Sequence, residues 1–137
     1  MSRDECSRYY RGVAALIAGM RESWQLGDVY CAALALSGSD RAQAPAEAMR
    51  ELWARIDRAD MVVLLWPEPA ATSALVEVGY ALARGIPVVC FHQEKAALPF
   101  LLAEDSECVR RFAYQAHTDL ERMVATSKIE EILPRAV

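Results

Sequence analysis

Residues 59–91 read ADMVVLLWPEPAATSALVEVGYALARGIPVVCF and decide the fold of this chain. The short apolar run 61–66 predicts a buried strand, residues 72–84 predict a helix that Gly85 ends, and 86–91 predict a second buried strand. Parallel strands need a crossover of this kind, and ligands bind beyond the carboxyl ends of such strands. Glu77 stands in the early turns of that helix, so it is the first candidate for a functional residue.

The remainder of the chain continues the alternation of helices and strands. The 137 residues have the length of one domain, and no linker or repeat divides residues 1–137. We therefore predict a single α/β domain, a flavodoxin-like three-layer sandwich with a four- to five-stranded, mainly parallel sheet. The further elements expected are a helix over 9–20, a strand over 29–36, a helix from Pro45 with an apolar stripe to Ile56, a short turn over 98–102, an edge strand over 109–114, and a last helix from Thr118 to before Pro134.

The chain opens on a helix, where a fold of this class normally opens on a strand. We expect the first strand of the fold to be missing, which leaves a sheet edge uncovered. A partner chain that covers this edge would complete the sheet, so we expect a homo-oligomer.

Composition narrows the class of protein. The net charge of −4 argues against a nucleic-acid or anionic-membrane surface, and the amino terminus has no apolar signal core. The four cysteines lack C-x-x-C spacing, and Cys31 and Cys90 lie in apolar runs, as small buried hydrophobes do. We therefore expect a reduced, cytoplasmic protein with no metal site and no cofactor.

Two interpretations of Glu77 are open from the residues alone. It is either a solvated acidic side chain favoured by the helix dipole or a catalytic carboxylate. Thr72 and Ser73 begin the helix directly after a strand, which makes a ready anion site. A carboxylate beside such a site suits glycosyl transfer, in which it attacks or shields an anomeric carbon. Gly79 in mid-helix predicts a close approach of this helix to a strand.

The segment resembles a known family. ADMVV at residues 59–63 and S-x-x-x-E-x-G-Y-A-x-A-x-G-x-P-V at residues 73–88 are similar to the nucleoside 2-deoxyribosyltransferase-like superfamily. That group contains deoxyribosyltransferases and nucleotide N-hydrolases, which release a base from a nucleoside monophosphate. The resemblance implies that Glu77 is the nucleophile that attacks C1′ of the sugar. It also implies a small-molecule nucleoside or nucleotide substrate.

Other positions follow from the same resemblance, with departures. The family's first strand and glycine-rich loop are not seen before Met1, and Ala71 stands where the transferases carry an aspartate. Glu51 lies about one position from the acidic residue of the N-hydrolases and is the candidate acid. Tyr10 stands where the family's substrate loop enters its first helix. Trp66 is placed either to stack on a base or to fill the core.

Three functions remain open. The first is N-glycosidic cleavage or transfer with Glu77 as nucleophile, Glu51 as acid, and Ser73, Thr72, Tyr10 and Trp66 at the substrate. The second is a non-catalytic nucleotide-binding or interaction module of the same fold. The third is an NAD-cleaving domain, because the signature is also similar to bacterial TIR-like domains. His92 is expected in a loop after its strand, and His117 beside a helix cap.

Overall fold

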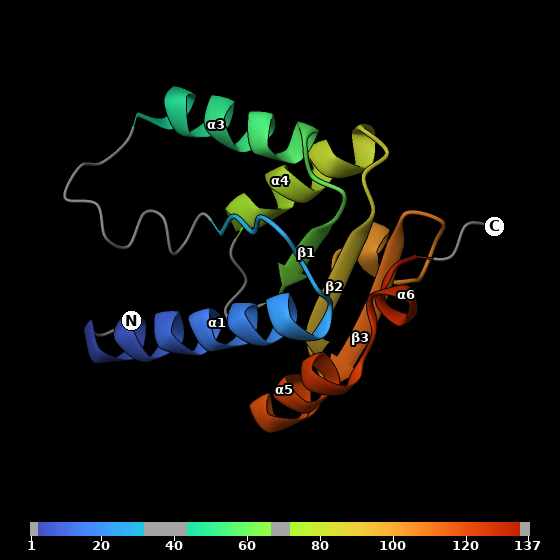
Figure 1. Cartoon of the computed structure of the whole chain (residues 1–137). Coiled ribbons are helices and arrows are strands. Elements are labelled where there is room, and N and C mark those ends of the chain that lie inside the picture. The colour runs from blue at the N-terminus through green and yellow to red at the C-terminus, as the bar shows by residue number, and fades with distance from the viewer. Residues whose placement is uncertain (1–2, 32–43, 67–71, 135–137) are drawn as a thin grey trace.

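The computed structural model describes residues 3–31, 44–66 and 72–134. Within them the chain forms five α-helices, one 3-10 turn and three strands (Figure 1). In chain order these are α1 (Arg3–Ser23), α3 (Pro45–Asp57), β1 (Val62–Leu65), α4 (Thr72–Ala83), β2 (Val88–Gln93), η1 (Phe100–Leu102), β3 (Val109–Tyr114), α5 (His117–Thr126) and α6 (Ile129–Ile132).

The described strands form one parallel sheet in the order β1-β2-β3. Val62 pairs with Val88, and Val88 pairs with Val109. The central strand β2 is buried along all but its last residue, which explains its unbroken apolar sequence. The crossover predicted from residues 59–91 is therefore confirmed.

Helices cover both faces of the sheet. Successive side chains of β2 point to opposite faces, so they alternate between the two layers of helices. Val88 and Cys90 pack with α3 and α4, whereas Val89 and Phe91 pack with α1, α5 and α6. Figure 1 shows the same division, with α3 and α4 on one side of the strands and α1 and α5 on the other. On the α1 side the aromatic rings form a row: Trp24 stacks on Phe91 at 6.1 Å, and Phe91 on Phe112 at 5.4 Å.

The sheet differs from the four or five strands expected. The described residues form three, so only the mixed α/β class with a parallel sheet is established. Residues 29–31 of the expected strand 29–36 form no strand, and residues 32–36 lie outside the described residues. The expected final helix is also divided, because Ser127 has extended backbone angles (φ −86°, ψ 151°) that end α5.

The two glycines of the α4 region have different reasons to be glycine. Gly85 has φ of +72°, which confirms its predicted role in ending the helix. The predicted close approach of Gly79 to a strand is wrong. Gly79 is exposed, and a Cβ atom there would meet nothing within 4 Å. Val78 and Ala81 form the buried face of α4 instead. No helix among the described residues has the length and apolar character that a bilayer crossing requires.

Candidate functional site

Helix α4 carries Glu77 in its second turn, on a half-buried part of the helix. Burial raises the pKa of the Glu77 carboxyl above its ordinary value, because desolvation disfavours the charged form. A solvated surface carboxylate would not experience this desolvation. The half-buried position of Glu77 therefore argues against its interpretation as a solvated acidic side chain.

Tyr30 is influenced by the charges of both candidate carboxylates. Its pKa is raised first by burial and then by the negative charges of Glu51 on α3 and Glu77 on α4. Both carboxylates are thus within electrostatic range of one phenol hydroxyl. The sequence does not single out Tyr30 as a functional residue, because it lies within the apolar run 29–36. Only its aromatic hydroxyl within that run offered a signal.

Arg55 fixes Tyr30 against α3. Its guanidinium lies over the Tyr30 ring, 4.6 Å from Cζ to the ring centroid, and its charge opposes the rise in the Tyr30 pKa. Its Nη1 atom also lies 3.8 Å from Oδ2 of Asp28, which is exposed. Asp28 and Tyr30, on either side of Val29, therefore connect the segment after α1 to Arg55 of α3.

Helices α3 and α4 are connected by a separate polar and aromatic network. Trp53 and Tyr80 stack with ring centroids 4.7 Å apart and planes within 2° of parallel. The Tyr80 hydroxyl donates to Oδ1 of Asp57 at 2.8 Å, and Nε of Arg84 donates to the same oxygen at 3.0 Å. The bond to Asp57 is the main cause that raises the pKa of Tyr80. These contacts hold in register the two helices that carry Glu51 and Glu77.

The structure places the other predicted residues less centrally. Ser73 is exposed in the first turn of α4, and Glu51 is exposed on α3. Tyr10 lies in α1 and Thr72 begins α4, but their side chains lie outside the described residues. Trp66 is 5% exposed and packs in the core on the α3–α4 side, so its interior position is established. It also lines a pocket at the end of β1.

Cys90 and His92 are both buried in β2. Burial raises the pKa of the Cys90 thiol to about 11, as expected for an inert interior cysteine. The expectation of a loop position for His92 is wrong, because it is buried in β2. Its Nδ1 atom lies 2.8 Å from the Gln93 carbonyl oxygen, which only accepts, so Nδ1 carries the proton. Among the described residues no group of three His, Cys, Asp or Glu side chains is arranged to hold a metal ion.

The arrangement places two carboxylates and a phenol on the side of the sheet that α3 and α4 cover. Such a set can supply a nucleophile, a proton donor and a hydrogen-bond donor to a substrate. No protein-family model matches the chain, and no curated protein matches it significantly.

Proposed function

We propose that this protein cleaves or transfers the N-glycosidic bond of a nucleoside or a nucleoside 5′-monophosphate, with Glu77 as the nucleophile. The single observation that carries the proposal is the desolvation of Glu77 beside Tyr30, with Glu51 near the same hydroxyl. A carboxylate that burial makes more basic is a stronger nucleophile once it has lost its proton. The similarity of residues 73–88 to the deoxyribosyltransferase-like pattern supports the same chemistry.

The proposed reaction has two balanced steps. A carboxylate oxygen of Glu77 attacks C1′, the C1′–N bond breaks, and its electron pair leaves with the base. Glu51 is the candidate acid that gives the departing nitrogen a proton. Water, or the N–H nitrogen of a second base, then attacks C1′ and gives its proton to the Glu51 carboxylate, while the bond from C1′ to Glu77 breaks and releases Glu77 as a carboxylate.

Tyr30 has a supporting role in this proposal. Its phenol is within electrostatic range of both carboxylates, and we assign it the role of a hydrogen-bond donor at the site. Ser73 and the first turn of α4 would bind a phosphate or a sugar hydroxyl. The flavodoxin-like sheet of four or five strands and the homo-oligomer belong to the same proposal, because a further strand at the free edge of β1 would extend the sheet beside the site.

The experiment is a base-release assay on the purified protein, read by chromatography of the freed base. The panel holds deoxynucleosides, their 5′-monophosphates, ribonucleotides and NAD. Wild type is compared with Glu77→Ala, with Tyr30→Phe, and with Glu104→Ala, which removes an exposed carboxylate from a loop. We expect release by wild type and by Glu104→Ala, a loss of at least about 1000-fold in Glu77→Ala, and a smaller loss in Tyr30→Phe.

Two other outcomes of the base-release assay would replace the proposed function with another. Ala71, in the position of the transferases' aspartate, favours a non-catalytic nucleotide-binding module. Release from no member of the panel by folded wild type, together with measurable binding of a nucleotide, would establish that module and refute the enzyme. Release from NAD alone would point to the chemistry of the TIR-like domains.

A further inference from the structure

A pocket lies between α1 and α5, at the ends of β1 and β3. Its cavity volume is about 300 Å³, at the lower end of the range for small-molecule pockets. Leu65 and Trp66 at the end of β1 and Tyr114 at the end of β3 line it, so it opens at the carboxyl edge of the parallel strands. Ligands of parallel α/β sheets bind at this edge. The described residues that line it include neither Glu77 nor Tyr30.

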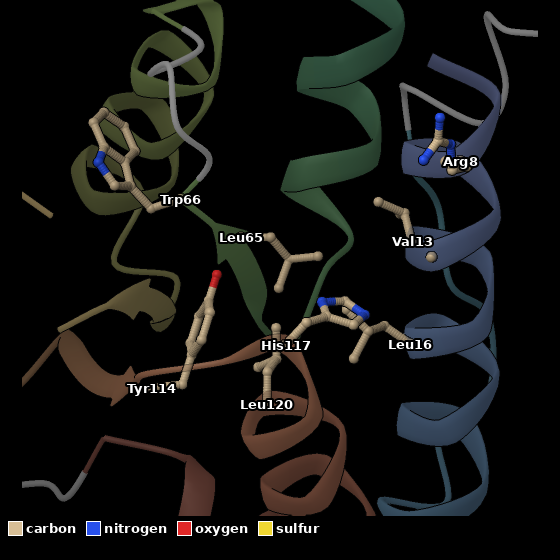
Figure 2. A pocket seen from close by; sticks show the side chains of 9 residues that line it. Arg8, Val13, Leu16, Leu65, Trp66, Tyr114, His117 and Leu120 are labelled. Atoms are coloured by element: carbon tan, nitrogen blue, oxygen red, sulfur yellow. The ribbon is translucent and has the colours of Figure 1, made fainter. Parts of the chain in front are cut away.

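The walls of this pocket are mostly apolar. Val13 and Leu16 from α1 face Leu120 from α5, and Leu65 points between them (Figure 2). Tyr114 lines the pocket from the end of β3, and Trp66 bounds it at the end of β1, with an indole that points away from Leu65 (Figure 2) and packs in the core with Val78 and Ala81. A cavity with this lining favours a compact apolar or aromatic body over a sugar, whose hydroxyls would lose their hydrogen bonds to water.

Among the described residues that line the pocket, Arg8 carries the permanent positive charge. Arg8 is exposed on α1 and lines the pocket from one end. Among the described residues no carboxylate pairs with its guanidinium. His117 begins α5, and its ring lies against α1, where a Cβ atom on Gly12 would be 3.9 Å from Nε2. Nε2 lies 3.1 Å from Oε1 of Glu121, which holds the ring in that orientation.

The geometry points to a binding site for a small organic monoanion with a compact apolar or aromatic body, such as an aromatic carboxylate. The body fills the apolar cavity, and the carboxylate reaches the guanidinium of Arg8, whose planar donors match two carboxylate oxygens. This site is separate from the proposed glycosidase site.

The test uses phenylacetate as the probe and its neutral amide, phenylacetamide, as the matched ligand. The chain has three tryptophans, and of these only Trp66 lines the pocket, whereas Trp24 packs under α1 and Trp53 stacks on Tyr80. Their indole N–H signals in nitrogen–proton correlation spectra therefore report the site of binding. We expect phenylacetate to shift the Trp66 signal, which is assigned with Trp66→Phe, and to leave the other two in place.

The variants separate the anion contact from general binding. Arg8→Gln should weaken phenylacetate at least about tenfold, because a charge-assisted contact is lost. Arg21→Gln makes the same change near the other end of α1, at an exposed residue outside the pocket, and should leave the affinity unchanged. Equal binding of the amide, equal binding by Arg8→Gln, or no shift of the Trp66 signal at about 20 mM phenylacetate, well above the dissociation constants that small-molecule sites reach, would overturn the proposal.

Discussion

The rings of Trp53 and Tyr80 stack face to face, with centroids 4.7 Å apart and planes within 2° of parallel. Trp53 lies two residues after Glu51 on α3, and Tyr80 lies three residues after Glu77 on α4. The stacked pair therefore sets the spacing of the two helices at the level of the candidate carboxylates. Asp57 extends the connection, since it accepts hydrogen bonds from both Tyr80 and Arg84.

Removal of the stacked indole should loosen α3 from α4. We expect Trp53→Leu to lower the free energy of unfolding by about 1 kcal/mol, the value of an aromatic pair beyond its buried area. Urea unfolding followed by far-UV circular dichroism measures this change. Met49→Leu, an exposed and volume-conserving change in the same helix, should have little effect. Equal stability of Trp53→Leu and wild type would show that the stack does not hold the helices together.

Glu77 should give stability an unusual pH dependence. Burial raises its pKa in the folded state, so folded Glu77 keeps its proton to a higher pH than unfolded Glu77. Its contribution to stability is fully present below the unfolded-state pKa of about 4.3 and is lost as pH rises through the folded-state pKa. Glutamine does not titrate and avoids this loss.

Glu77→Gln should therefore become more stable relative to wild type as the pH rises above the unfolded-state pKa of about 4.3. Urea unfolding at a series of pH values gives the difference. Glu104→Gln, at an exposed residue, serves as the control and should follow wild type across the range. A difference between Glu77→Gln and wild type that is constant with pH would contradict desolvation of Glu77.

The two glycines of the α4 region should respond to alanine with opposite signs. Gly79→Ala adds a Cβ atom into open space in a helix, so it should stabilise the protein by about 0.5–1 kcal/mol. Gly85→Ala places a Cβ atom on a residue with φ of +72° and should destabilise it by about 1 kcal/mol. Thermal unfolding of both variants checks the pair. A loss of stability in Gly79→Ala would contradict the open space at this position and would support the close helix–strand approach expected from the sequence.

The sequence by itself determined the crossover from β1 through α4 to β2, because the signals for it are local. A continuous apolar run, a helical period and a glycine stop each depend on residues that are neighbours in the chain. The same locality explains why the predicted bounds of α3, η1, β3 and the start of α5 are close to those observed, whereas α1 begins at Arg3, well before the predicted start at Tyr9.

Only the tertiary structure decided which residues meet. Tyr30 lies near Glu51 and Glu77 because Arg55 holds the segment after α1 against α3, and no spacing in the sequence encodes that contact. The pocket of Arg8, Trp66 and His117 brings together both ends of the chain and its middle. Gly79 faces outward because the packing of Val78 and Ala81 sets the rotation of α4. A helical period gives the faces of a helix, but burial against a particular sheet selects which face turns inward.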